Sequence, residues 1–116
     1  MANVDDATRM RHMLEYAEMA VRLSSSRSRR DLDTDELFPL AMVRAVEVVG
    51  EAAARVSAQG RSQYPQLPWP LIVGMRNRLI HGYDEVDLNI LWETLVHELP
   101  ELIATLKRIL PPVPGP

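Results

Sequence analysis

The sequence lacks cysteine altogether, which excludes both a disulfide framework and a thiolate metal site. Glycine is scarce, with five in 116 residues, and the many Ala, Leu, Met, Glu and Arg residues favour helix throughout. No apolar run approaches the length of a membrane span, and the polar, acidic stretch 1–6 is unlike a signal peptide. These absences predict a cytoplasmic, all-α protein without a membrane segment.

Positive charge is also limited. The chain has 13 Lys and Arg against 16 Asp and Glu, which gives a formal net charge of -3. Avid, non-specific binding of nucleic acid needs a strong basic field, so any contact with RNA must be local. A chain of this length can bury one core without covalent staples. We therefore expect a single domain over residues 1–116, built as an antiparallel bundle of four to five helices.

Four helices are expected from the periodicity and the terminal signals. Apolar residues at helical spacing predict a helix over about 5–24 and another from about 34 to 59. Asp33 and Glu36 have capping-box spacing at the start of the second helix. Pro70 and Gly82 bound a third helix over 70–81, since proline fits a first turn and glycine follows a helix end. Asp87 is a good N-cap for a last helix, which Pro100 is expected to kink or restart.

Helical wheels predict which side chains face the core. The expected buried residues of the first three helices are Met10, Met13, Leu14, Ala17, Val21, Leu23, Ala41, Ala45, Val48, Val49, Ala52, Val56, Leu71, Ile72, Met75 and Leu79. Arg76, Asn77 and His81 fall largely on the face opposite the core stripe of the third helix. Val73 and Ile80 lie among these polar residues, and this mixture indicates a contact with another helix or another subunit.

Arg76 and His81 supply the chemistry that the motif can perform. His81 can exchange a proton near neutral pH, and Arg76 offers a planar fork of donors for a phosphate. Together they suit phosphodiester transesterification, in which His81 moves a proton and Arg76 stabilises the more negative transition state. Asn77 would orient His81 or a phosphate oxygen. One histidine cannot be both acid and base, but a symmetric dimer would bring a second His81 to a shared cleft.

Further side chains are candidates for supporting roles. The residues Arg44, Glu47, Glu51 and Arg55 form a charged stripe, which is ordinarily a solvated ladder of ion pairs. Glu47 or Glu51 could instead hold Arg76 in position. The loop that carries Arg27, Arg29 and Arg30 is either a solvated loop or a phosphate contact, and Arg78 is another candidate RNA contact. No His and carboxylate cluster has ligand spacing around the motif, so we expect no metal and no cofactor.

An R-x4-H-x-Y signature is present in the sequence. Four residues separate Arg76 from His81, and one residue separates His81 from Tyr83. With Asn77 after the arginine and Trp69 upstream, it resembles the HepT-type branch of the HEPN superfamily. The stretches 44–53, 68–87 and 91–94 resemble the same branch, so the resemblance covers nearly the whole chain.

The resemblance implies an all-helical homodimer that acts as a toxin and carries the motif of a metal-independent endoribonuclease. It further implies a partner, a cognate minimal nucleotidyltransferase (MntA-like) antitoxin. In that family the motif tyrosine, matched here by Tyr83, accepts AMP from the partner. The expected site is therefore Arg76, His81 and Asn77, with Tyr83 as the modified residue.

Three other interpretations stay open at this point. Arg76, Asn77 and His81 could simply form a polar helix face that caps a bundle. The chain could be a catalytically silent binding module that chiefly engages the nucleotidyltransferase. It could also be a nucleotide-binding or sensor domain that uses Arg76 for phosphate. Cleavage of RNA that is lost with His81→Ala separates the endoribonuclease from all three.

Overall fold

A computed structural model describes residues 4–112, and nearly every element in this range is helical. The helices are α1 (Val4–Ser24), α2 (Asp31–Thr34), α3 (Leu37–Ala54), α4 (Ala58–Gln63), α5 (Trp69–Val73), α6 (Met75–Leu79), α7 (Leu88–Glu93), a π-helix (Thr94–Glu98) and α8 (Leu99–Ile109). The β structure of the described range is one isolated antiparallel bridge between Ile80 and Val86. The prediction of an all-α fold is confirmed.

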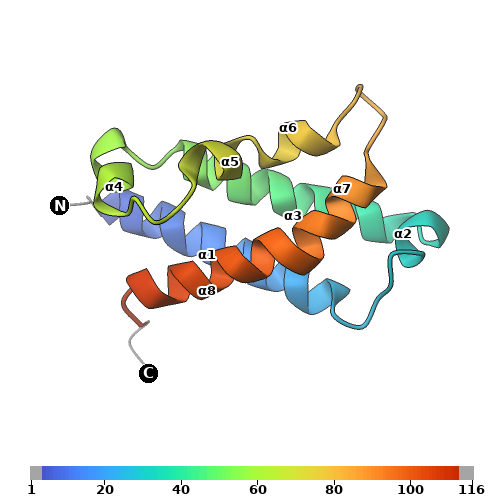
Figure 1. The fold of residues 1–116 in the computed structure, drawn as a ribbon, viewed down its shortest axis with the longest axis horizontal. Helices are drawn as coiled ribbons and strands as arrows, with labels where there is room; N and C mark the ends of the chain where they lie inside the picture. Colours follow the sequence, from blue (N-terminus) through green and yellow to red (C-terminus); the bar gives the residue numbers. More distant parts are fainter. Residues whose placement is uncertain (1–3, 113–116) are drawn as a thin grey trace.

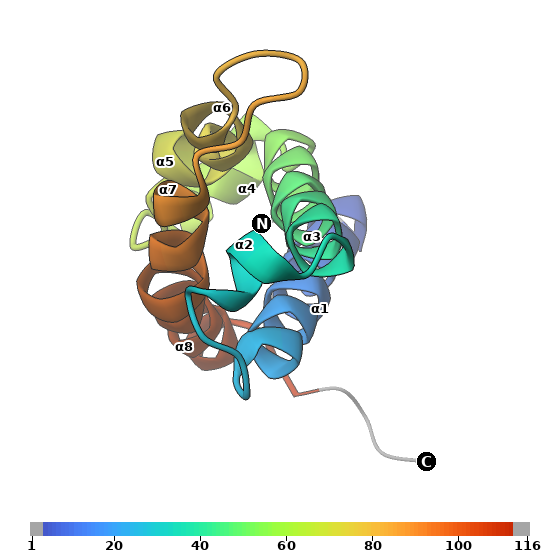
Figure 2. The same ribbon diagram turned by 90° about the vertical axis from the view of Figure 1, so that its right-hand side faces the viewer.

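The helices run antiparallel in four rods (Figure 1). These rods are α1, α3, the pair α5 and α6, and the continuous stretch formed by α7, the π-helix and α8. α1 packs against both α3 and α8, while α5 and α6 lie along α3. The view along the bundle shows the loop between α6 and α7 projecting beyond the helices (Figure 2). Within residues 4–112, no helix is both long and apolar enough to cross a membrane.

The core is built from aliphatic and methionine side chains on facing helices. Met10 and Met13 of α1, Met42 of α3 and Leu79 of α6 are almost fully buried. The last rod contributes Leu91, Leu95, Leu99, Leu102 and Leu106. Burying each such side chain contributes about 1.5–3 kcal/mol to folding. Leu79 ends α6, so this burial anchors the C-terminal end of the motif helix.

The first helix agrees with the prediction, whereas the second differs in its boundaries. Residues 31–63 form three helices, α2, α3 and α4, rather than one. The expected capping box is wrong, because the backbone N–H of Leu37 donates to Asp35 Oδ1 at 2.9 Å and Glu36 makes no side-chain cap. α4 begins at its own N-cap, Ser57, whose hydroxyl donates 2.6 Å to the buried Asp6.

The predicted buried face of the second helix is confirmed at Ala45, Val49, Ala52 and Val56 and is wrong at two positions. Ala41 is exposed and Val48 is half-buried, while Met42, Val46 and Ala53 face the core. In the same way, Leu23 and Leu71 were expected to be buried and are exposed.

The predicted helix over 70–81 is interrupted at Gly74 and ends early. Its two parts are α5 and α6, and the chain at Ile80 is already extended. Gly82 therefore lies in the following loop and does not cap the helix. At this break α5 ends close against α3, beside Gly50. A Cβ at position 50 would lie 3.3 Å from the carbonyl oxygen of Ile72 and 3.4 Å from that of Val73.

The last rod has both features that the sequence predicts. Asp87 is the N-cap of α7, and its Oδ1 accepts hydrogen bonds from the backbone N–H groups of Asn89 and Ile90, both at 3.0 Å. Pro100 follows a π-helix and occupies the first turn of α8. Because proline removes one helical hydrogen bond and crowds the carbonyl four residues earlier, a wider turn just before it is physically reasonable.

Candidate active site

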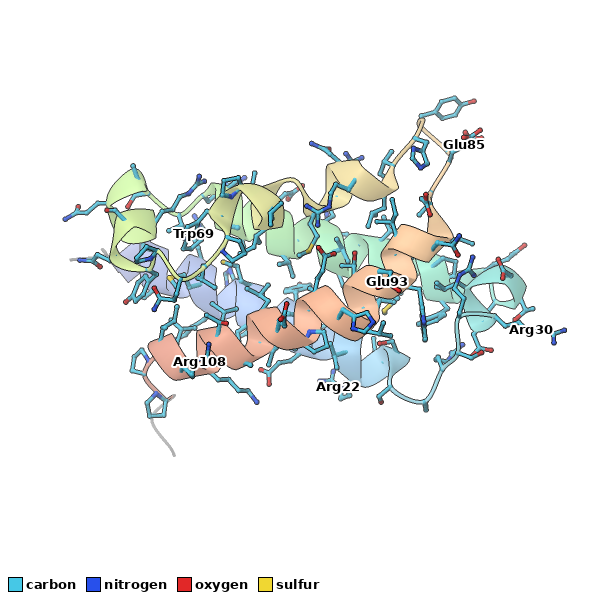
Figure 3. All side chains as sticks on the ribbon, viewed as in Figure 1. Arg22, Arg30, Trp69, Glu85, Glu93 and Arg108 are labelled. Carbon is cyan, nitrogen blue, oxygen red and sulfur yellow. The ribbon has the colours of Figure 1, made fainter. Side chains whose placement is uncertain are left out.

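The motif residues lie on α6 and on the loop that follows it. The loop is closed by the antiparallel bridge between Ile80 and Val86. This bridge consists of two hydrogen bonds: the His81 N–H donates 2.9 Å to Glu85 O, and the Asp87 N–H donates 2.7 Å to Leu79 O. Glu85 lies at the projecting end of this loop (Figure 3). These two backbone hydrogen bonds within nine residues define the path of the loop and the position of His81.

Arg76 is held by Glu47 of α3. Its Nε lies 2.9 Å from Glu47 Oε2, and its side chain is 46% exposed. Glu47 also pairs with Arg44, and hydrogen bonding from Arg44, with a smaller contribution from Arg76, lowers the pKa of Glu47. The carboxylate therefore stays ionised near neutral pH. Because the contact uses Nε, the two terminal amino groups of Arg76 remain as donors for a phosphate.

His81 contacts the residue that begins the next helix. Its Nε2 lies 3.2 Å from Asp87 Oδ2, and its side chain is 54% exposed. The backbone hydrogen bond from Ile90 and the contact with His81 lower the pKa of Asp87, so this carboxylate is also ionised near neutral pH. Arg76 and His81 thus each have a carboxylate partner and a half-exposed side chain.

The other two motif residues make fewer contacts. Asn77 is exposed, and its amide makes no hydrogen bond to His81. Tyr83 is fully exposed in the loop. The structure therefore presents Tyr83 to solvent and shows no contact through which Asn77 could orient His81.

Arg78 points to the interior side of the motif helix. It donates 2.8 Å to Glu98 Oε1 and 2.9 Å to the carbonyl oxygen of Leu71. Glu98 in turn contacts the buried Thr94 hydroxyl at 2.9 Å. This network joins α5, α6 and the π-helix, so the observed contacts of Arg78 are structural.

The arginines of the loop before α2 are largely engaged with neighbouring groups. Arg27 pairs with Asp35 at 2.9 Å and stacks over the ring of Phe38 at 4.7 Å. Arg29 pairs with Asp33 at 3.0 Å and donates 2.9 Å to Asn89 Oδ1 at the start of α7.

Arg30 is exposed and has no side-chain partner among residues 4–112; it extends into solvent (Figure 3). The Arg29–Asn89 contact places this loop at the same end of the bundle as His81.

Sequence reasoning missed the contact between Asp87 and His81. It identified Asp87 only as a helix cap, although an acidic N-cap six residues after a histidine, with a glycine between them, is a signal for such a contact. It also could not choose between Glu47 and Glu51. The structure shows that Glu47 contacts Arg76, while Glu51 is exposed one turn further along α3.

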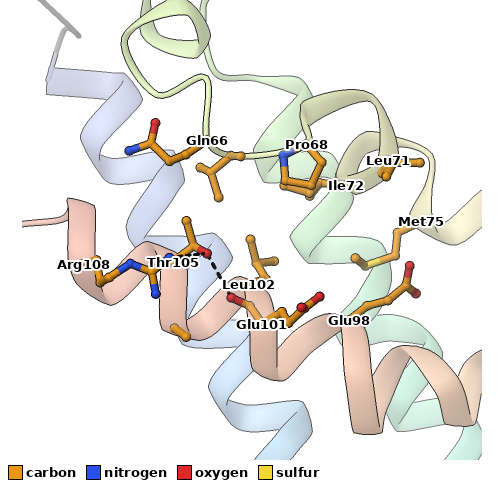
Figure 4. A pocket seen from close by; sticks show the side chains of 12 residues that line it. Gln66, Pro68, Leu71, Ile72, Met75, Glu98, Glu101, Leu102, Thr105 and Arg108 are labelled. Carbon is orange, nitrogen blue, oxygen red and sulfur yellow. Dashed lines mark hydrogen bonds between the residues drawn. The ribbon is translucent and has the colours of Figure 1, made fainter.

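The motif lies on open surface. A hollow of about 480 Å³ separates α5 from α8 and is lined by residues that include Ile72, Met75 and Leu102 (Figure 4). Another, of about 340 Å³, lies between α1 and α3. Neither includes Arg76 or His81. Among residues 4–112, no group of three or more His, Asp or Glu side chains could hold a metal ion.

Comparison with known proteins shows which family this chain resembles. The profile of a family described as "Ribonuclease HepT-like" matches residues 13–109. A protein of Caldanaerobacter subterraneus subsp. tengcongensis, named a "Putative RNase", is 36% identical over 87% of this chain and 90% of its own length. One of the proteins of Methanocaldococcus jannaschii with the same description is 31% identical over 89% of this chain and 85% of its own length. A "Probable ribonuclease HepT" of Thermococcus cleftensis is 32% identical over 68% of this chain and 72% of its own length. No solved structure matches significantly.

Proposed function

The chain belongs to the HepT-like ribonuclease family, and on that premise we propose that it is a metal-independent endoribonuclease. The observation that carries the proposal is the pairing of Arg76 with Glu47 and of His81 with Asp87. Each pair fixes a group suited to phosphoryl chemistry while leaving half of its side chain open to a ligand. A cation and a proton carrier presented in this way are the minimum that RNA transesterification needs.

In the proposed reaction, the 2′-oxygen of a ribose attacks the adjacent phosphorus and the bond to the 5′-oxygen of the next nucleotide breaks. His81 takes the proton of the 2′-hydroxyl, and a second, protonated histidine gives a proton to the departing 5′-oxygen. The products are a 2′,3′-cyclic phosphate and a free 5′-hydroxyl. Arg76 stabilises the additional negative charge on the phosphoryl oxygens, and Asn77 donates a hydrogen bond to one of them.

The second histidine comes from a second copy of the chain. Two observations support a homodimer: Arg76 and His81 lie on open surface, and an exposed stripe of α3 leads to them. Leu37 and Leu40 are exposed, and Leu40, Arg44 and Glu47 follow at spacings of four and three, which place them on one face of the helix. Apolar side chains beside a motif that needs a second histidine fit a symmetric interface.

We further propose that the protein is the toxin of a toxin–antitoxin pair. Its antitoxin would be a minimal nucleotidyltransferase that transfers AMP to Tyr83. In that step the Tyr83 oxygen attacks the α-phosphorus of ATP and pyrophosphate leaves. Full exposure of Tyr83 makes its oxygen accessible to such a partner. The added phosphate would then neutralise charge near Arg76 and obstruct the cleft.

The test is cleavage of total cellular RNA by the purified, unmodified protein in the presence of EDTA. Arg76→Ala and His81→Ala are compared with Arg55→Ala and His97→Ala, which replace exposed residues of the same types outside the motif. We expect the parent and both controls to cleave and both motif variants to lose at least about 100-fold in rate. No cleavage by the parent, with mass spectrometry showing an unmodified Tyr83, would favour the silent binding module.

A further inference from the structure

Asp87 has two separate contacts, one through each carboxylate oxygen. Oδ1 accepts the backbone N–H groups of Asn89 and Ile90 and so caps α7. Oδ2 lies 3.2 Å from His81 Nε2. The two hydrogen bonds to Oδ1 restrict rotation of the carboxylate, and therefore Oδ2 is held facing the imidazole.

The protonation state of Asp87 determines what His81 must do at this contact. Hydrogen bonds from Ile90 and His81 lower the pKa of Asp87, so the carboxylate is ionised near neutral pH. An ionised carboxylate can only accept hydrogen bonds. The imidazole must consequently donate through Nε2, and in its neutral form the lone pair is then on Nδ1.

We propose that Asp87 is the positioning residue of His81, which fixes the imidazole with hydrogen on Nε2 and leaves Nδ1 to take the proton of the RNA 2′-hydroxyl. The assignment of the hydrogen to Nε2 rests on the observed contact with an ionised carboxylate and not on the proposed function. The assignment of Nδ1 as the base rests in addition on the proposed function.

The competing explanation is that Asp87 merely caps α7. Aspartate, asparagine and serine are similarly good N-caps, so a role limited to capping predicts similar behaviour for all three. A positioning role predicts that they differ, because only aspartate can cap α7 with one oxygen and offer a second acceptor to Nε2. Substitutions of Asp87 can thus separate its role as the cap of α7 from its role in positioning His81.

The decisive variant is Asp87→Asn. The oxygen of the introduced amide can still accept the Asn89 and Ile90 N–H groups, while its NH2 group takes the place of Oδ2. This NH2 group only donates, so the neutral imidazole must accept through Nε2 and place its hydrogen on Nδ1. We expect RNA cleavage to fall by at least about 100-fold, as a forced change of tautomer does in Ser-His-Asp hydrolases.

Asp87→Ser and Ser57→Ala serve as comparisons. Asp87→Ser retains a capping oxygen but is too short to reach His81, so the ring loses its partner without being forced into the other tautomer. We expect a smaller loss, of about 10-fold. Ser57→Ala removes the N-cap of α4, far from the motif along the chain, and destabilises the fold without touching His81. It should retain the rate of the parent at a temperature where all variants are folded.

Nitrogen-15 NMR of the full chain provides a readout that does not depend on activity. The His81 ring signals, assigned by their absence in His81→Ala, should show hydrogen on Nε2 in the parent at a pH where the ring is neutral, and on Nδ1 in Asp87→Asn. A parent ring with hydrogen on Nδ1, or cleavage by Asp87→Asn at the rate of the parent, would overturn the inference. A parent that cleaves no RNA but shows this tautomer change would disprove the proposed function and retain Asp87 as the positioning residue.

Discussion

Glu47 connects two arginines in the motif region, because its single carboxylate contacts both Arg44 and Arg76. Ion pairs at a protein surface contribute little to stability individually, about 0–1 kcal/mol. Their value here is geometric, since Glu47 ties the motif helix to α3 at the position of Arg76. Removing the charge should therefore affect the site more than the fold.

We predict that Glu47→Gln lowers the free energy of unfolding at pH 7 by about 0.5–1 kcal/mol. The two arginines lower the pKa of Glu47 in the folded state. The contribution of Glu47 to the free energy of unfolding is therefore fully present at a pH above its unfolded-state pKa. This contribution is lost as the pH falls through its folded-state pKa. The difference in unfolding free energy between parent and variant should thus start to shrink as the pH falls below about 4.3, the usual glutamate pKa, and disappear at more acidic pH.

Chemical denaturation at several pH values measures this difference. Glu51→Gln is the matched control, since Glu51 is an exposed glutamate on the same helix and does not contact Arg76. A difference between parent and Glu47→Gln that stays constant down to pH 3 would show that the effect is not due to the charge of Glu47.

At the scale of elements, the position of the motif helix depends on Gly50. The carbonyl groups that end α5 lie so close to α3 that a Cβ at position 50 would be in tight contact with two of them. α6 follows α5 after one residue, so displacement of α5 moves Arg76 as well. Close contact between α3 and α5 is therefore a requirement of the site and not only of the core.

We predict that Gly50→Leu lowers the free energy of unfolding by about 1–3 kcal/mol, the usual cost of overpacking. Leucine favours helix more than glycine does, so the loss would come from the collision with α5. The rate of RNA cleavage should fall together with the stability, because the displaced α5 disturbs the pairing of Arg76 with Glu47. Thermal unfolding and cleavage rates check both effects. Ala54→Leu, an exposed position on the same helix, should change neither.

Elements that depend on local signals could be predicted from the sequence, and those that depend on distant contacts could not. The first helix and the Asp87 cap follow from periodicity and capping chemistry. The close contact of α5 with Gly50, which lies 24 positions before the break at Gly74, cannot be read locally.

The same distinction holds for the motif region. The spacing of Arg76, His81 and Tyr83 is visible in the sequence, and their placement on α6 and the next loop follows from it. The choice of Glu47 over Glu51 depends on how α6 is aligned along α3. The contact of His81 with Asp87 depends on the path of the loop between α6 and α7.

At the scale of the whole molecule, the exposed leucines Leu37 and Leu40 on α3 and the open position of the motif lead to one expectation about assembly. If a second copy covers Leu37, Leu40 and the motif, the shared cleft contains two Arg76 and two His81 side chains. Assembly would then create the acid and base pair that one chain lacks. Folding and activity become separable, since a folded monomer would have only half of the reacting groups.

We predict that Leu40→Glu converts the protein from dimer to monomer and lowers cleavage by at least about 10-fold, because a charge at the centre of an apolar contact is costly to bury. Sedimentation equilibrium gives the oligomeric state, and circular dichroism should show an unchanged helix content. Leu71→Glu is the control, because Leu71 is 57% exposed, against 69% for Leu40, and lies on α5 beside the hollow facing α8. A dimeric Leu40→Glu protein would place the interface elsewhere.

The π-helix has a consequence for the phase of the last rod. Leu91, Leu95 and Leu99 are spaced by four residues, and in an uninterrupted α-helix each such step would rotate the side chain by about 40° around the axis. A π-helix holds more residues per turn, so the segment Thr94–Glu98 compensates this rotation and all three leucines stay buried on one side. Deleting a single residue from it would convert the wide turn to ordinary α-helix, and seven steps of about 100° would leave the apolar face of α8 within about 20° of its present direction relative to α7. One wide turn in this rod therefore accommodates both Pro100 and the four-residue spacing of the leucines.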